Sequence, residues 1–83
     1  MEKSIYTRDY AVLLRLLRQA RERAGITQVQ LAKRLKQSQS FVSKMERGDR
    51  RIDVVQLRTI CQLYGSTLTE FVEELEAELS AAE

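Results

Sequence analysis

The residues best suited to specific chemistry lie in one short segment, from Ser38 to Arg47, where polar and apolar side chains alternate at helical spacing. Val42 and Met45, with Phe41 beside them, form the apolar stripe of a helix, so the polar side chains face outward. An outward Gln can form a bidentate pair with adenine, and an outward Lys can donate to O6 and N7 of guanine. The alternative is an ordinary solvated surface. The outward side chains are those of Gln39, Ser40, Ser43 and Lys44.

The composition argues against catalysis and metal binding. The chain has no His, which is the commonest metal ligand and the usual general base. Its single Cys61 has no partner for an internal disulfide and falls on the apolar stripe of a predicted helix, which favours a core position. We therefore predict no enzyme activity, no metal and no cofactor.

Charge is distributed unevenly along the chain. All fourteen Lys and Arg residues lie in residues 1–58, beside six acids, which gives this part a net charge of +8. Residues 59–83 carry six Glu and no base, a net charge of −6. A basic body with an acidic tail is typical of a protein that meets a polyanion on one side, although a merely solvated surface would also fit.

Length and residue types predict an all-α fold in a single domain over residues 1–83, with its core at about residues 8–75. The chain has 83 residues, no Pro and three Gly, too little turn punctuation for a domain of many short strands. No apolar run approaches the ~18 residues of a membrane span, and no apolar block of a signal peptide follows the first residues. We expect a cytoplasmic protein.

Cap residues and apolar spacing delimit five helices. The first has Tyr10, Leu13, Leu14, Leu17, Ala20 and Ala24 on one face. The second is opened by Thr27 with Gln30 in a capping box, and the third by Ser38. The predicted helices start at Thr7 or Arg8, Thr27, Ser38, Asp53 and Thr67, and they end at Ala24, near Leu35, before Gly48, before Gly65 and at residue 82.

From Thr27 to Gly48 the chain reads T-Q-V-Q-L-A-K-R-L-K-Q-S-Q-S-F-V-S-K-M-E-R-G, which resembles the helix-turn-helix of the lambda repressor and Cro family, the Xre type. The D-V-V-Q-L that begins at Asp53, the L-Y-G that ends at Gly65 and the L-T-E-F that ends at Phe71 resemble the family's later helices. The resemblance spans about residues 10–75. It implies a five-helix DNA-binding domain with the helix-turn-helix at helices two and three.

The resemblance also implies roles for individual residues. Gln39, Ser40, Ser43 and Lys44 occupy the positions that touch base edges in the family, and Arg21 and Glu46 match a pair that joins the first helix to the third. Gln28 lies where backbone N–H groups of a helix N-terminus can hold a phosphate oxygen. Basic side chains flanking the third helix would supply non-specific affinity for phosphate, although such side chains are solvated by default. They are Lys33, Lys36, Arg47, Arg50 and Arg51.

One position departs from the family pattern. Lys36 stands in the turn where Gly is usual, and a Lys with positive φ costs about 1 kcal/mol relative to Gly. We expect the turn to tolerate Lys36, with its charge facing phosphate, or to differ in detail.

The last predicted helix bears on oligomerisation. Its apolar stripe spans over three turns, longer than a small body needs, so we expect a homodimer with Phe71, Leu75 and Leu79 at its interface. Two copies would present their third helices about 34 Å apart, one turn of duplex. The alternative is that this helix only completes the core of one chain.

The function expected from this resemblance is sequence-specific transcriptional regulation by a dimeric repressor or autoregulator, acting on the nucleoid of a bacterium or on a phage genome. Its partners would be double-stranded DNA, a second copy and, in some circuits, a toxin or polymerase. The alternative is a protein-interaction module with the same fold.

Overall fold

The computed structural model describes residues 7–81 and confirms an all-α fold. The predicted end of the last helix at residue 82 lies outside the described residues. No helix in residues 7–81 combines the length and the apolar character needed to cross a membrane. The helices are α1 (Arg8–Arg23), α2 (Gln28–Leu35), α3 (Gln39–Arg47), α4 (Val54–Leu63) and α5 (Leu68–Ala81).

Side-chain caps begin the helices where the sequence predicts them, because each cap satisfies an N–H group that has no partner within the helix. The Ser38 hydroxyl accepts from the Phe41 N–H (3.1 Å) to open α3. Thr27 and Gln30 form a complete capping box at the start of α2. The corresponding side-chain caps of α1, α4 and α5 come from Thr7, Asp53 and Thr67.

Lys36 ends α2 in the left-handed conformation, with φ 58° and ψ 42°. Its N–H donates to the Lys33 carbonyl (3.1 Å), and the Gln37 N–H donates to the Ala32 carbonyl (2.9 Å). These bonds satisfy carbonyls at the helix end that would otherwise lack a partner. The exchange of Gly for Lys therefore leaves the helix stop in place.

All five helices contribute side chains to one core, whose fully buried side chains include Leu17, Leu31, Met45, Ile60 and Cys61. Two predictions for the inward face of α1 are wrong. Leu16, absent from the predicted face, is buried, and Ala24, expected to face inward, is exposed. Ala24 is the residue after the last turn of α1, where the chain leaves the helix and its periodicity.

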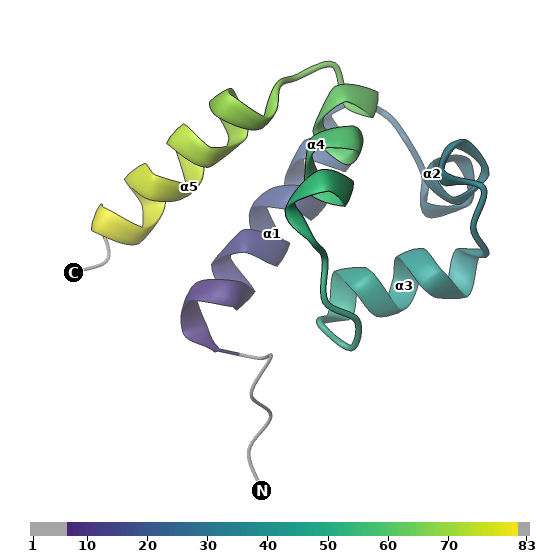
Figure 1. The fold of residues 1–83 in the computed structure, drawn as a ribbon, viewed down its shortest axis with the longest axis horizontal. Coiled ribbons are helices and arrows are strands. Elements are labelled where there is room, and N and C mark those ends of the chain that lie inside the picture. The colour runs from purple at the N-terminus through teal and green to yellow at the C-terminus, as the bar shows by residue number, and fades with distance from the viewer. Residues whose placement is uncertain (1–6, 82–83) are drawn as a thin grey trace, which may run out of the picture.

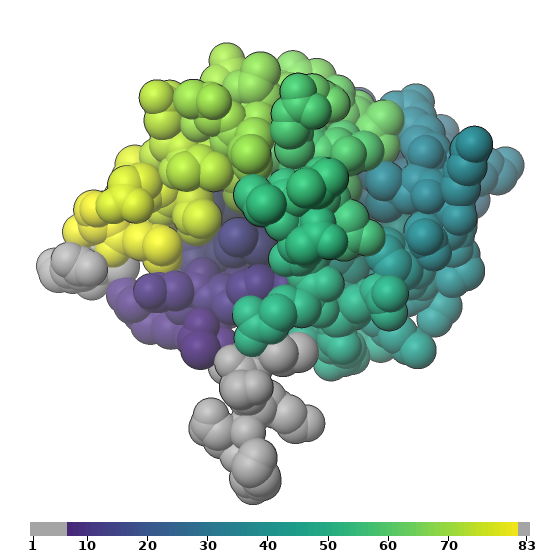
Figure 2. Space-filling model, in the orientation of Figure 1, coloured from purple at the N-terminus to yellow at the C-terminus, as the bar shows by residue number. Residues whose placement is uncertain are grey.

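Helices α1 and α4 occupy the middle of the molecule, with the α2–α3 unit (residues 28–47) on one side and α5 on the other (Figure 1). Helix α2 packs most extensively against α3, whereas α5 packs on α1 and α4. In the space-filling view the α2–α3 unit and α5 cover opposite flanks (Figure 2). The fold therefore keeps α3 apart from the acidic C-terminal helix α5. Because α3 carries the predicted base-contacting residues, it is called the reading helix below.

Candidate nucleic-acid interface

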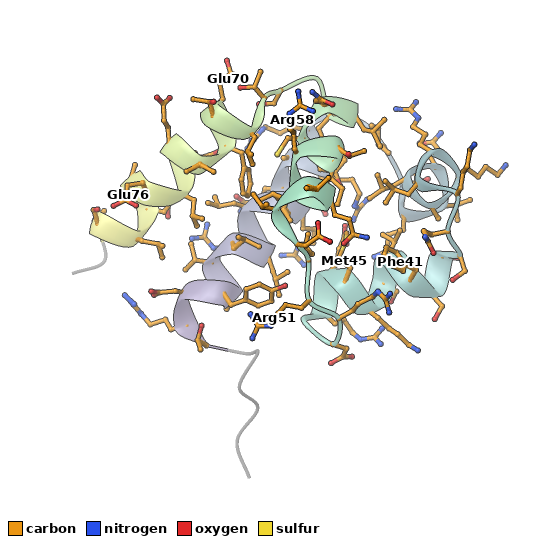
Figure 3. The ribbon with its side chains drawn as sticks, viewed as in Figure 1. Phe41, Met45, Arg51, Arg58, Glu70 and Glu76 are labelled. Carbon is orange, nitrogen blue, oxygen red and sulfur yellow. The ribbon has the colours of Figure 1, made fainter. Side chains whose placement is uncertain are left out.

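Helix α3 has one buried face and one exposed polar face. Val42 and Met45 are fully buried beneath it, and Met45 points toward the middle of the molecule (Figure 3). The side chains of Gln39, Ser40 and Lys44 are exposed. The structure thus brings these three predicted base-contacting residues together on one outward surface.

The fourth predicted base-contacting residue is already engaged. Ser43 is half-buried, and its hydroxyl accepts from Nη1 of Arg47 (2.7 Å). Nε of Arg47 donates to Oδ2 of Asp49 (3.2 Å). Arg47 therefore lies along the last turn of α3, next to the exposed polar face.

A buried ion pair fixes the C-terminal end of α3 to α1. Arg21 donates through Nε to Glu46 Oε2 (2.6 Å) and through Nη2 to Glu46 Oε1 (3.1 Å), and its Nη1 donates to the Ile26 carbonyl (2.9 Å). This hydrogen bonding to Glu46 raises the pKa of Arg21 further above its usual value. The two side chains are only 10% and 7% exposed. The orientation of α3 is therefore held by bidentate, directional bonds.

Gln28 extends this pair to the start of α2. Its Nε2 donates to Glu46 Oε1 (2.9 Å), so one acidic side chain binds groups from α1 and α2. This contact occupies part of the side chain that the sequence assigns to a phosphate. The phosphate contact assigned to this position stays a prediction, for which the backbone N–H groups in the first turn of α2 are the suitable donors.

The loop between α3 and α4 carries two arginines that point in different directions. Arg50 stacks over the Phe41 ring, with 4.5 Å from Cζ to the ring centroid, and so lies beside the reading helix. Arg51 instead stacks over the Tyr10 ring of α1 (5.3 Å), away from Phe41 (Figure 3). Arg51 therefore lies on the α1 side of the loop, and its assigned phosphate contact stays a prediction. Tyr10 holds this loop, because its hydroxyl also accepts from the Ile52 N–H (3.3 Å).

The other predicted phosphate-binding residues, Lys33 and Lys36, are exposed on α2 and on the turn that follows it. Sequence reasoning missed two contacts that shape this surface, the Gln28–Glu46 bond and the Arg50–Phe41 stack. Each joins residues from different elements, so helical periodicity carries no signal for either. Phe41 packs on the core beneath Arg50, in line with its place on the apolar stripe of the helix.

Helix α5 differs from the prediction at one of its three assigned interface residues. Phe71 is 4% exposed and belongs to the core of the single chain, so it has no surface to offer a second copy. Leu75 and Leu79 are half-buried, and Val72 is exposed. Leu75 and Leu79 line an open groove of about 280 Å³ between α1 and α5, together with Tyr10, Leu13 and Arg51.

A left-handed turn between two short helices, with the second helix anchored by apolar residues and polar on its outer face, defines a helix-turn-helix domain. Comparison with known proteins agrees. A family model described as a helix-turn-helix domain matches residues 12–75. A solved structure, an XRE-family like protein from Pseudomonas syringae pv. tomato str. DC3000, is 46% identical with a TM-score of 0.79, and the match covers 84% of this chain and 85% of that one. Comparison with curated proteins gives no match.

The chain therefore belongs to the Xre-type helix-turn-helix family, a class of DNA-binding regulators. This finding confirms the family predicted from the Thr27–Gly48 segment.

Proposed function

We propose that the protein is a cytoplasmic transcriptional repressor or autoregulator that binds a palindromic operator in bacterial or phage DNA as a homodimer. The observation that carries this proposal is the exposed polar face of α3 above the buried Val42 and Met45. A helix held in this way can enter the major groove, while its apolar side stays in the protein. Membership of the Xre-type family supports the DNA-binding part of the proposal.

Base recognition is assigned to the first two turns of α3. Gln39 and Lys44 are exposed and carry the side chains that pair with adenine and guanine edges, while the short Ser40 lets the helix come close. Ser43 is assigned to the same face, where its hydroxyl accepts from Arg47, one of the arginines assigned to phosphate.

Phosphate contacts are assigned to groups around this helix. Lys33 and Lys36 are exposed on the α2 side, and Arg47 and Arg50 lie on the side of the loop before α4. The N-terminus of α2 at Gln28 offers backbone N–H groups. Such contacts position the helix on the duplex and make its affinity depend on salt.

Dimerisation is assigned to α5. The half-buried Leu75 and Leu79 and the exposed Val72 give this helix an apolar surface that the single chain does not cover. Two copies related by a two-fold axis would read half-sites about 34 Å apart.

Selection of bound duplexes from a random pool tests the proposal. We expect a palindromic consensus for the wild type, and Gln39→Ala relaxes the preference at one or two positions in each half-site. Arg50→Ala, the matched phosphate-side change, weakens all sequences alike and lowers the slope of log affinity against log salt by about 0.9. An unchanged consensus with Gln39→Ala would show that the assigned orientation of α3 is wrong.

The alternative function is a protein-interaction module that binds a toxin or a polymerase. The exposed side chains of Val54 and Val55, at the start of α4, favour this alternative because they offer an apolar surface outside the DNA-binding face. Binding to random duplex at two salt concentrations separates the two functions. A steep loss of affinity with salt supports DNA binding, and a weak, flat response supports the interaction module.

A further inference from the structure

A second groove, of about 350 Å³, lies between α1 and α3, and of its lining residues only Arg47 belongs to the surface assigned to DNA above. We propose that this groove is an anion site and takes one backbone phosphate of the duplex, beside the half-site that α3 reads. The inference rests on the proposed function and extends its interface to α1. The groove is lined by Ala11, Leu14, Arg15, Arg18, Glu46 and Arg47.

The α1 wall of the groove is one helical face. Ala11, Leu14, Arg15 and Arg18 follow the spacing at which side chains lie one above the other, so the Cβ atoms of the two arginines lie about 5–6 Å apart. Arg18 is exposed, and within residues 7–81 its side chain makes no ion pair or hydrogen bond. It is therefore available to an anion without breaking an existing contact.

The one acid in the groove does not cancel this charge. Both carboxylate oxygens of Glu46 accept from Arg21, and one of them also accepts from Gln28. Its negative charge is therefore neutralised by a guanidinium that does not line the groove. Arg47 is paired with Asp49 and Arg15 with Glu78, both in exposed ion pairs, so Arg18 is the groove's arginine whose charge is not shared with an acid among the described residues.

Arg47 connects the groove to the reading helix. Its Nη1 donates to Ser43, one of the residues on the α3 surface, while its side chain lines the groove. A duplex that contacts α3 therefore passes next to the groove, and a backbone phosphate is the anion that this continuity favours over a free one. Arginine is suited to this role because its fork of N–H donors matches phosphate oxygens.

Helix α5 competes for the same groove. Nη2 of Arg15 is paired with Glu78 Oε1 (3.0 Å), and the two side chains are 43% and 46% exposed. An ion pair this exposed is weak, so a phosphate can displace Glu78 from Arg15. The acidic tail then reduces, but does not prevent, phosphate binding.

The test measures affinity for a selected operator duplex against salt concentration. We expect Arg18→Gln to weaken binding about three- to fivefold and to lower the slope of log affinity against log salt by about 0.9. Arg58→Gln is the matched control, because Arg58 is an exposed arginine on α4, away from α3 (Figure 3), and should leave both values unchanged. Thermal unfolding of both variants checks that the fold is retained.

A second pair of variants tests the competing acid. Glu78→Gln should strengthen binding about twofold, because it releases Arg15. Glu73→Gln removes the same charge from an exposed position on α5 that does not bind Arg15, and it should have a smaller effect. Equal effects of the two changes would mean that only the net charge of α5 matters and would overturn the role of Glu78.

The outcomes separate this inference from the function on which it rests. If the wild type binds the operator and Arg18→Gln behaves like Arg58→Gln, the groove takes no phosphate of the duplex and the inference is overturned. A wild type that binds no duplex overturns the proposed function and the inference with it. A final experiment titrates the protein with inorganic phosphate and monitors the NMR signals of the arginine Nε–H groups. If phosphate changes these chemical shifts in the wild type but not in Arg18→Gln, and DNA binding is the same in both, the groove is assigned to a free anion instead.

Discussion

The α2–α3 unit and α5 are both tied to α1 by an arginine–glutamate pair, but the two pairs have opposite surroundings. Arg21 and Glu46 are 10% and 7% exposed, make bidentate contact and share Gln28. Arg15 and Glu78 are about half exposed and make a single contact. The reading helix is therefore held in a fixed orientation, whereas the end of α5 can change partners at small cost.

Glu46→Gln is the change with the largest expected effect. It leaves the Arg21 charge buried without a carboxylate, so we expect the free energy of unfolding to fall by about 3 kcal/mol, measured by urea denaturation. Glu78→Gln, the same substitution in the exposed pair, should change it by less than about 0.5 kcal/mol. Similar losses in the two variants would remove the distinction between the two regions.

Leu79→Glu tests the free surface of α5. A charge beside the groove that Leu75 and Leu79 line should dissociate the proposed dimer, observed as a halved mass in sedimentation, and weaken operator binding about a hundredfold. Val54→Glu places the same charge on the exposed start of α4 and should leave the dimer intact. Dissociation by Val54→Glu alone would move the interface from α5 to α4.

Tyr64→Phe tests a buried hydroxyl group that lies near the Arg21–Glu46 pair. Within the described residues the Tyr64 hydroxyl is buried without a hydrogen-bond partner, so its removal should stabilise the protein by about 1 kcal/mol in urea denaturation. Burial, with Glu46 nearby, raises the pKa of Tyr64 above its usual value near 10.

A pH dependence follows from this shift. Above about pH 10 the unfolded chain ionises at this residue while the folded chain does not, so the wild type should lose stability as the pH rises. Tyr64→Phe should lose less over the same range. Equal alkaline losses in both proteins would contradict the assigned shift.

Lys36→Gly is expected to have the smallest effect. Glycine adopts φ 58° without the steric cost that Lys bears, so stability should rise by about 0.5 kcal/mol after the added freedom of the unfolded chain is counted. An unchanged operator consensus would accompany this gain, since the helix stop is already in place. A changed consensus would mean that the lysine alters the pitch of α3.

Cap chemistry made most of the fold predictable. A hydroxyl or carboxylate that caps a helix acts within three residues of itself, so Thr27, Ser38 and Asp53 marked their helices without knowledge of the packing. The family resemblance placed Lys36 in a turn where Gly is usual, and the structure shows that Lys36 adopts the left-handed conformation there. The pairing of Arg21 with Glu46 rested on the family resemblance, because 25 residues separate them and no local pattern joins them.

The local sequence of residues was therefore sufficient to predict the helices, where they end and the outward face of α3. The directions of Arg50 and Arg51, the burial of Phe71 and the arginine groove between α1 and α3 emerged only when distant segments packed together. The physical reason is the separation along the sequence over which each interaction acts. A cap or a turn is settled by neighbours in sequence, whereas burial and the partner of a long basic side chain depend on which helix arrives beside it.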